Sequence, residues 1–319
     1  MKTAVVMMNL GGPDSLDAIE PFLYNLFSDP DIFKIPIGQK LFAKIISTRR
    51  APKVAEEYRL IGGKSPINDW TEIQRKMLES KLKTYDENIS VITAMRYWHP
   101  LTEEAVEEIQ KGNFKKIILL PLYPHFSVST TGSSFNEWDR HFESDGREVL
   151  RIQNYHTNDF YIRALNERID ETILRFPAEI RKDIQLVFSA HGTPVSMVKK
   201  GDPYSKHILE TVNKVMEGRN FSHPHHLCYQ SKVGPVKWLT PATDTMIEEL
   251  AEQGKKNLLI IPISFVSDHV ETSFELDIEY RHVADENNIE NYIVMKGLND
   301  SKLFIDALYD ETLKMLAKN

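Results

Sequence analysis

Side chains that can bind a metal ion or move protons follow two apolar segments of this chain. Residues 184–188 lead into His191, and a glycine and a proline within 192–194 break the chain directly after it. A second apolar run, 258–265, leads into the Ser-Asp-His-Val-Glu segment 267–271. Such runs are typical of strands in an open α/β sheet, whose ligands lie beyond the carboxyl ends of the strands. An imidazole that faces carboxylates there can bind a metal ion or transfer protons.

Taken alone, His191 also fits a turn histidine that bonds to backbone, but the second polar strand end favours a site. The expected partner is Glu271, which the fold must bring close because it lies far away in the sequence. A histidine and a glutamate with open coordination positions suit the transfer of a metal ion better than its permanent binding.

The second strand end carries an acidic cluster. If a helix begins near Asp268, then Asp268, Glu271 and Glu275 share one face at i, i+3 and i+7. The alternative is helix capping with a solvated acidic face, because the helix dipole favours carboxylates in the first turn. Capping explains Asp268 and Glu279 better than it explains Glu271 and Glu275, which repel each other at i, i+4 unless a cation or proton lies between them.

Apolar segments that alternate with amphipathic ones predict the elements that position these residues. The predicted strands are 4–9, 91–95, 116–122, 184–190, 227–230 and 257–265, and helical patterns include 102–110, 159–176, 205–216 and 244–253. Buried strands that alternate with helices predict an α/β fold with parallel sheets covered on both faces.

The two halves of the chain resemble each other. Residues 100–123 align without a gap with residues 241–264, and the identical positions include Pro100 with Pro241 and Pro121 with Pro262. This predicts two similar doubly wound lobes with a cleft between them. We expect residues 1–155 to form the N-terminal lobe, and 156–319 the C-terminal lobe with the metal and proton site. The last helix is free to pack back on the first lobe.

The same alignment shows where the lobes differ. His191 falls opposite Leu10, and Glu271 falls opposite Thr130. The polar chemistry therefore belongs to one lobe, while the other presents apolar or hydroxyl groups. We interpret this asymmetry as suited to a large, flat, apolar ligand.

Composition excludes several classes of function. The net charge is −7 and no long basic block occurs, so we expect no nucleic-acid partner. The single cysteine, Cys228, excludes an intramolecular disulfide and a four-cysteine cluster held by this chain alone. The N-terminal apolar run is too short for a signal peptide, and the longest one, 258–266, is about half a membrane span. We expect a cytoplasmic protein without a transmembrane helix.

Residues 21–42 are rich in large apolar side chains and are interrupted by Pro30 and Pro36. Residues 22–27 fit a helix core. The remainder is harder to bury, and we interpret it as an apolar lip that meets a hydrophobic ligand or the inner face of the membrane, as peripheral contact. Arg49 and Arg50 follow, either as surface charges or as donors to ligand carboxylates.

Several segments, taken together, resemble the ferrochelatase family over essentially the whole chain. They are Asn9-Leu-Gly-Gly-Pro13, Arg49-Arg50, Tyr58-Arg-x-Ile-Gly-Gly-x-Ser-Pro-Ile67, Met95-Arg-Tyr-x-His-Pro100, Tyr123-Pro124, Ser129-Thr-Thr-Gly-Ser-Ser134, Ser189-Ala-His191, Gly201-Asp-Pro-Tyr204, Gln230-Ser-Lys-Val-Gly-Pro235, Trp238-Leu239, Ser267-Asp-His-x-Glu-Thr272 and Glu275-Leu-Asp-Ile-Glu-Tyr280. The resemblance implies a lyase, a metal chelatase that inserts ferrous iron into protoporphyrin IX and releases two protons in the last step of haem biosynthesis.

The resemblance also implies roles for single residues. His191 resembles the family histidine that binds the metal or takes a pyrrole proton, Glu271 its acidic partner, and Glu275 part of an acidic path. Asp268 and His269 resemble residues that surround this pair. The residues that resemble porphyrin contacts are Met8, Arg50, Tyr58, Ser65, Arg96, Tyr123 and Trp238.

Departures from the family pattern refine the expectation. Gly-Thr-Pro follows His191 where many members have Ser-Leu-Pro, so the turn differs while the histidine stays. Some members hold an iron–sulfur cluster, but the corresponding turn position here is Val128 and no cysteines occur near the C-terminus. We therefore expect no required cofactor. The Ser-rich turn and the lip resemble the protoporphyrin branch more than the coproporphyrin branch.

Two alternatives remain open from the sequence. One is a non-catalytic carrier of a tetrapyrrole or metal on the same fold. The other is a chelatase for another metal or ring, such as cobalt and an earlier tetrapyrrole, although the motifs fit that class poorly.

Overall fold

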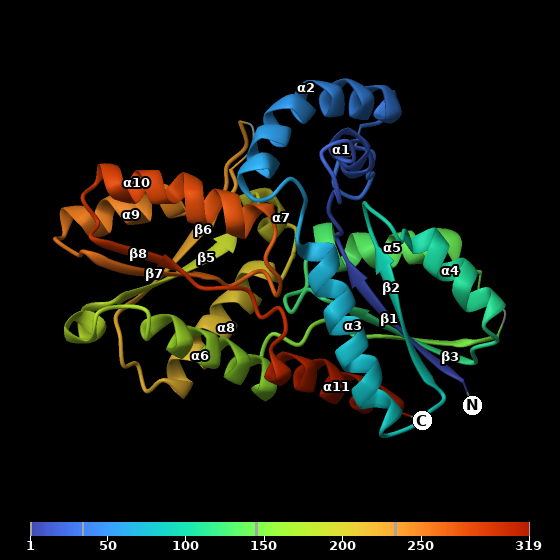
Figure 1. Ribbon diagram of the computed structural model, residues 1–319. Helices are drawn as coiled ribbons and strands as arrows, with labels where there is room; N and C mark the ends of the chain where they lie inside the picture. The colour runs from blue at the N-terminus through green and yellow to red at the C-terminus, as the bar shows by residue number, and fades with distance from the viewer. Residues whose placement is uncertain (1, 34, 144–145, 233–234, 319) are drawn as a thin grey trace. The chain divides into compact units, whose positions relative to one another are not determined.

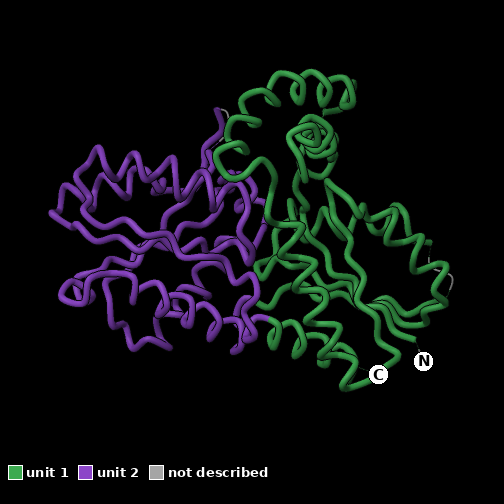
Figure 2. The backbone as a smooth tube through the Cα atoms, viewed as in Figure 1, with its two compact units in different colours: residues 1–155, 305–319 green, residues 156–304 purple. Residues whose placement is uncertain are grey.

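The computed structural model describes residues 2–33, 35–143, 146–232 and 235–318. Lys34 of the predicted lip and Val233-Gly234 of the Gln230–Pro235 motif lie outside the described residues, as do both ends of the predicted lobes, Met1 and Asn319. The chain divides into two compact units (Figure 2): unit 1 comprises residues 1–155 and 305–319, and unit 2 comprises residues 156–304.

Unit 1 is built on a parallel sheet of four strands in the order β2-β1-β3-β4. Its elements are β1 (Thr3–Asn9), α1 (Ile19–Phe27), α2 (Gln39–Leu60), α3 (Ile67–Lys83), β2 (Ile89–Met95), α4 (Thr102–Lys111), β3 (Lys116–Pro121), the π-helix η1 (Val128–Gly132), α5 (Ser133–His141), β4 (Glu148–Arg151) and most of α11 (Lys302–Leu316). The central strands β1 and β3 are buried at every position, which explains the apolar runs 4–8 and 117–120 within them.

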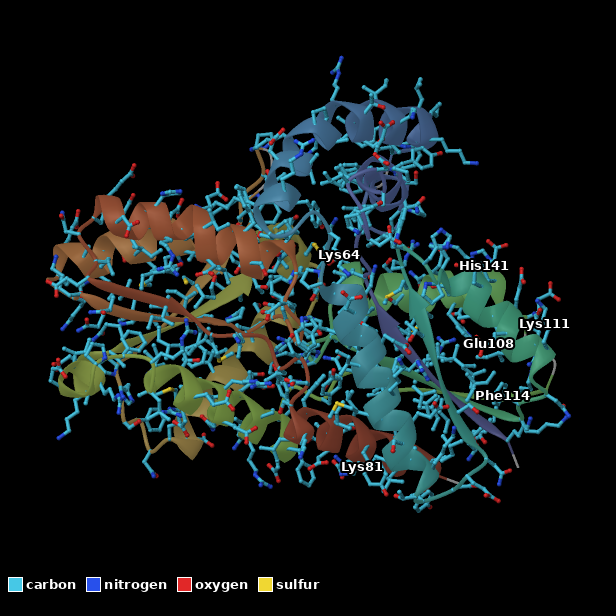
Figure 3. The ribbon with its side chains drawn as sticks, viewed as in Figure 1. Lys64, Lys81, Glu108, Lys111, Phe114 and His141 are labelled. Carbon is cyan, nitrogen blue, oxygen red and sulfur yellow. The ribbon has the colours of Figure 1, made fainter. Side chains whose placement is uncertain are left out.

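Helices cover both faces of this sheet (Figure 1). On one face, Ile109 of α4 and Trp138 of α5 pack with Val6 and Ile117 in a continuous core. The other face is covered by α3 and α11 (Figure 1). Lys81, near the end of α3 (Figure 3), pairs with Asp306 of α11. Burial of apolar side chains on both faces is the main term that stabilises such a layered unit.

Unit 2 repeats this architecture with the strand order β6-β5-β7-β8, also all parallel. Its elements are α6 (Asp159–Ile173), the 3₁₀-helix η2 (Ala178–Asp183), β5 (Gln185–His191), α7 (Val195–Lys199), α8 (Tyr204–Gly218), β6 (His225–Gln230), α9 (Thr243–Glu252), β7 (Asn257–Pro262), the π-helix η3 (Glu271–Glu279), α10 (Tyr280–Glu286) and β8 (Asn291–Val294). Helices α9 and α10 cover one face, and α6 and α8 cover the other (Figure 1).

The identical strand order confirms the prediction of two similar α/β lobes with parallel sheets. All six predicted strands are present. The edge strands β4 and β8 were not predicted, because each has only four residues and is partly exposed, so neither has a clear apolar period.

A helix does begin close to Asp268, as predicted, but it is not the α-helix that the shared face of the three carboxylates requires. Helical geometry begins at Val270, and Glu271–Glu279 form a π-helix, with Asp268 before it in an irregular segment. The three carboxylates therefore do not share one α-helical face. The wider π-helical turn recurs in unit 1, where η1 contains Thr130, the residue aligned with Glu271.

The predicted apolar lip spans the segment between α1 and α2. The rings of Phe27, Phe33 and Phe42 pack on one another with centroids 5.2 to 6.4 Å apart. Beyond them, Ile37 is 91% exposed and Leu41 is 67% exposed. The base of the lip is thus packed, while its tip presents apolar side chains to solvent.

Among the helices of the described residues, none is long and apolar enough to span a membrane.

Candidate metal and proton-transfer site

Two strand ends of unit 2 bring His191 and Glu271 together. His191 is the last residue of β5, and Glu271 opens η3 beyond β7. Nδ1 of His191 lies 2.8 Å from Oε2 of Glu271. The imidazole keeps 39% of its side-chain surface exposed and Glu271 keeps 26%, so the pair is accessible from one side.

In the neutral form of the imidazole, this pairing fixes the tautomer. An ionised carboxylate can only accept, so Nδ1 of His191 carries the proton that it donates to Glu271. The lone pair of Nε2 is then available, and among the described residues no hydrogen bond reaches it. A neutral imidazole with an accessible Nε2 can accept a proton or bind a divalent metal ion.

Glu275, four residues further along η3, is held by donors around the end of β6. Its carboxylate accepts from the backbone N–H of Ser231 at 2.8 Å and from the Ser231 hydroxyl at 2.6 Å. Tyr280 donates to it at 3.1 Å and the Gln230 amide at 3.3 Å. Ser231 has φ +63°, a left-handed conformation uncommon for a residue other than glycine, which turns both of its donors toward Glu275.

The pKa values of the two carboxyl groups are shifted in opposite directions. Burial would raise the pKa of Glu271, but His191 and the neighbouring His269 outweigh it and hold this pKa well below its ordinary value. Burial raises the pKa of Glu275, and the negative charge of Glu271 raises it further. Glu271 is thus an anion beside the imidazole, whereas Glu275 takes up a proton more readily, which relieves the repulsion expected between them.

The same balance acts on the histidine. Burial would lower the pKa of His191, but the negative charges of Glu271 and Glu275 raise it above its ordinary value. An imidazole poised in this way gains a proton readily, and the anion beside it stabilises the imidazolium that forms.

Known proteins resemble this sequence over almost its whole length. The family model described as ferrochelatase matches residues 2–316. The ferrochelatase of Citrifermentans bemidjiense is 46% identical over 313 residues, which cover 97% of each chain. That of Geotalea uraniireducens is 47% identical over 311 residues and 96% of each chain. That of Gloeobacter violaceus is 43% identical over 322 residues, 99% of this chain and 98% of the relative. The chain belongs to the ferrochelatase family.

Membership of the ferrochelatase family makes the chain a metal chelatase of the lyase class, which inserts a metal ion into a porphyrin for haem synthesis. The alternative of a non-catalytic carrier is therefore wrong.

Solved structures agree with the fold. SirB from Bacillus subtilis with Fe³⁺ matches with a TM-score of 0.57 at 11% identity, over 99% of this chain and 96% of that chain. DR2241 from Deinococcus radiodurans, described as structurally similar to chelatases, matches with a TM-score of 0.52 at 11% identity, over 99% and 55%. At these identities the likeness carries the two-lobed α/β chelatase fold alone.

His269 and Asp268, the residues expected around the ferrochelatase pair, have different surroundings. His269 is buried, its Nδ1 faces the carbonyl of Ser267 at 3.2 Å, and burial lowers its pKa. The carboxylate of Asp268 has other partners: it accepts from the backbone N–H of Gly297 at 2.8 Å and from the Asn299 amide at 2.7 Å. Asp268 thus fixes the segment that precedes η3.

Trp238 lies beside the turn that follows His191. A Cβ built on Gly192 would approach the Trp238 ring to 3.4 Å and the Gln230 carbonyl oxygen to 2.6 Å. The backbone of Thr193 accepts from Leu239 at 3.1 Å, which holds the two segments together. The Gly at 192 is therefore required by close packing next to the catalytic histidine expected for this family.

The other expected porphyrin contacts lie in unit 1. Met8, Tyr58 and Ser65 are buried, with 1%, 2% and 2% of their surface exposed, and Met8 belongs to the core beneath α4 and α5. Tyr123 follows β3 and is 9% exposed. Arg50 is exposed on α2.

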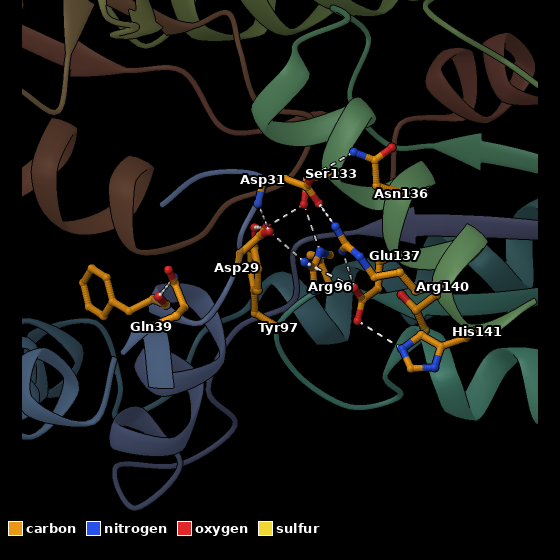
Figure 4. Close-up of polar contacts among 12 residues, drawn as sticks. Asp29, Asp31, Gln39, Arg96, Tyr97, Ser133, Asn136, Glu137, Arg140 and His141 are labelled. Atoms are coloured by element: carbon orange, nitrogen blue, oxygen red, sulfur yellow. Dashed lines mark hydrogen bonds and ion pairs between the residues drawn. The ribbon is translucent and has the colours of Figure 1, made fainter. Parts of the chain in front are cut away.

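Arg96 is held by a buried polar network in unit 1 (Figure 4). Its guanidinium lies 2.9 Å from Asp29 and 3.4 Å from Glu137, and its Nε donates to the Ser133 hydroxyl at 2.9 Å. Asp29, only 1% exposed, also accepts from Tyr97 at 2.7 Å. The network ties the end of β2 to α5 and to the segment after α1, so the charge of Arg96 is engaged within the protein.

Sequence reasoning missed three hydroxyl groups at this site: those of Ser231, Tyr204 and Ser264. Ser231 and Tyr204 stand in segments that resemble the family, but nothing local marks them as neighbours of His191. Ser231 and Ser264 follow the ends of β6 and β7, and Tyr204 is the first residue of α8. These positions were the available signal, because polar residues beyond the carboxyl ends of parallel strands gather at one edge of the sheet.

Proposed function

We propose that this chain inserts ferrous iron into protoporphyrin IX, with His191 as the residue that accepts a pyrrole proton or binds the incoming metal. The observation that carries the proposal is the hydrogen bond of 2.8 Å between Nδ1 of His191 and Oε2 of Glu271. It leaves Nε2 as the acceptor and places an anion where an imidazolium would form.

Metal insertion needs two pyrrole protons to leave and Fe²⁺ to lose water. His191 supplies a base near neutral pH, and Glu271 lowers the cost of charging it. Glu275 with its raised pKa extends this acidic line and can hold a proton in transit. Apolar walls that fit a bent ring better than a flat one would favour the transition state.

The predicted porphyrin contacts are part of the same proposal. Trp238, which packs beside the turn after His191, supports a wall role next to the site. Arg50 is exposed and can meet a propionate as a bidentate donor. Met8, Tyr58, Ser65, Arg96 and Tyr123 are proposed as further porphyrin contacts, and the resemblance of their segments to the family supports this.

Membrane contact and location belong to the same proposal. The exposed Ile37 and Leu41 support peripheral contact of the lip with a membrane face, in a cytoplasmic protein. A required cofactor is not part of the proposal: the sequence has one cysteine, Cys228, which is buried, so this chain alone cannot supply four thiolates to a cluster.

The decisive experiment is an anaerobic assay with Fe²⁺ that follows the porphyrin absorption spectrum, with protoporphyrin IX and coproporphyrin side by side. We expect conversion of protoporphyrin with the higher kcat/KM. Faster conversion of coproporphyrin would move the chain to the other branch. Faster insertion of Co²⁺ than of Fe²⁺ into either ring would contradict the choice of metal.

A further inference from the structure

The backbone of His191 is held by two hydroxyl groups from different elements of unit 2. Its N–H donates to the Ser264 hydroxyl at 2.9 Å. Its carbonyl oxygen accepts from the Tyr204 hydroxyl at 3.1 Å. The two hydroxyls also lie 2.6 Å from each other. Both peptide groups that flank the histidine are therefore tied to the same pair of side chains.

Each hydroxyl has a single proton, and this assigns the donor and the acceptor in each of these contacts. A carbonyl oxygen can only accept, so the single proton of the Tyr204 hydroxyl points at His191. The short contact between the hydroxyls must then use the proton of Ser264, whose oxygen accepts from the His191 N–H. The result is a closed ring: His191 N–H to Ser264, Ser264 to Tyr204, and Tyr204 back to the His191 carbonyl. We name this the hydroxyl ring.

The hydroxyl ring stands where the sheet stops. The ladder between β5 and β7 ends as Ile263 donates to the Ser189 carbonyl at 3.1 Å, because Pro262 closes β7 and the chain turns. The next backbone N–H of β5 on the side of β7, that of His191, does not donate to a backbone carbonyl of β7. It donates to the Ser264 hydroxyl in place of a backbone carbonyl.

We propose that Ser264 and Tyr204 are positioning residues for metal insertion: through the hydroxyl ring they hold the His191 backbone so that its imidazole meets Glu271. This inference rests on the function proposed above. Among the described residues, the imidazole itself has a hydrogen bond with Glu271 and a T-shaped contact with the ring of Phe265, with centroids 6.1 Å apart. The backbone clamp supplies the remaining restraint, because the side chain can be no better placed than its Cα.

The test compares Ser264→Ala, Tyr204→Phe, the double variant and Ser264→Thr in the full-length protein. We expect each single variant to lower kcat on the order of tenfold with an almost unchanged KM for porphyrin. Because either change opens the same ring, the double variant should lose little more than the more affected single variant. Ser264→Thr keeps the hydroxyl and should retain most of the turnover.

A second measurement separates the hydroxyl ring from the proposed reaction. In nitrogen-15 NMR spectra, Ser264→Ala should speed hydrogen exchange at the His191 amide and shift the imidazole Nδ1 signal, whatever the protein converts. The exposed sites Ser80→Ala and Tyr85→Phe serve as matched controls. If wild-type protein shows no chelation, the proposed function fails while these spectra still decide whether the ring exists.

Three outcomes would overturn the inference. Fully additive losses in the double variant would show that the two hydroxyls act separately. An unchanged kcat together with an unchanged Nδ1 signal in both single variants would show that the ring positions nothing. An equal loss in Ser264→Thr and Ser264→Ala would assign the effect to packing, and thermal melting identifies any variant that fails to fold.

Discussion

Nδ1 of His191 and Oε2 of Glu271 lie 2.8 Å apart, although the two residues are 80 positions apart in the sequence. The contact joins the end of β5 to the start of η3, so it depends on both strand ends. Nδ1 of the imidazole is therefore bonded, whereas Nε2 is available to accept a proton or bind a metal ion.

Replacing His191 by alanine should abolish metal insertion, with a loss of at least about 10³-fold in kcat, because the base or metal ligand is removed. The protein should stay folded and still bind porphyrin, as porphyrin fluorescence quenching will measure. His282→Ala, at an exposed histidine of α10, is the control. Wild-type turnover in the His191 variant would remove this residue from the mechanism.

Replacing Glu271 by glutamine keeps the shape but removes the charge beside the imidazole. We expect kcat to fall by about 10²-fold, because an amide stabilises an imidazolium poorly. Steady-state kinetics at fixed Fe²⁺ measure this loss. Glu279→Gln, at the far end of the same π-helix, should have a much smaller effect, and equal losses in the two variants would argue against a specific role for Glu271.

Asp29→Asn should destabilise unit 1 rather than change catalysis directly. Burial would raise the pKa of Asp29, but Arg96 and hydrogen bonds from Ser133 and Tyr97 lower it, so the native state holds a charged pair. Removing one partner of a buried pair costs about 3 kcal/mol of unfolding free energy. Urea unfolding measures it, with Asp31→Asn as the more exposed control. A stable Asp29 variant with a raised KM would instead indicate that Arg96 serves the substrate.

We expect the free energy of unfolding to decrease as the pH falls, because the pKa of His207 is lowered in the folded state. Its ring stacks on His156 with centroids 3.9 Å apart, and burial together with the neighbouring imidazole lowers the pKa of His207 to about 4. Glu210 and Asp202 oppose this shift. The folded state therefore resists a proton that the unfolded chain binds near its ordinary pKa of about 6.5.

The stabilisation linked to His207 is complete above pH of about 6.5 and is lost as the pH falls toward about 4. Solvent screens the partly exposed ring, so we expect a loss of about 1–2 kcal/mol. His207→Asn should flatten the dependence of the unfolding free energy on pH across this window, whereas His282→Asn should not. Parallel curves for wild type and His207→Asn would contradict the linkage.

The exposed tip of the lip should set membrane affinity. The double variant Ile37→Ser/Leu41→Ser removes two large apolar side chains, and we expect binding to phospholipid vesicles to weaken by about tenfold or more. Co-sedimentation with vesicles measures it. Leu174→Ser, at a side chain of unit 2 that is 65% exposed, is the matched control. Equal binding by the two variants would remove the lip from the interaction.

Much of the fold could be predicted from the sequence, because buried parallel strands are continuously apolar. The apolar runs that form β1, β3, β5 and β7 are of this kind. The internal repeat of the sequence corresponds to the identical strand order of the two units. The short edge strands β4 and β8 escaped prediction because partial exposure removes the apolar signal. The π-helical turns escaped because no local pattern distinguishes them from α-helix.

The sequence by itself determined the chemical groups of the site and the family, since residue types and motifs are local properties. Only the tertiary structure decided that His191 bonds to Glu271, that Ser231 holds Glu275, and that Ser264 and Tyr204 clamp the histidine backbone. These contacts depend on where each strand ends and on how neighbouring strands are aligned. Both are fixed by long-range packing of the sheet, which no short stretch of sequence encodes.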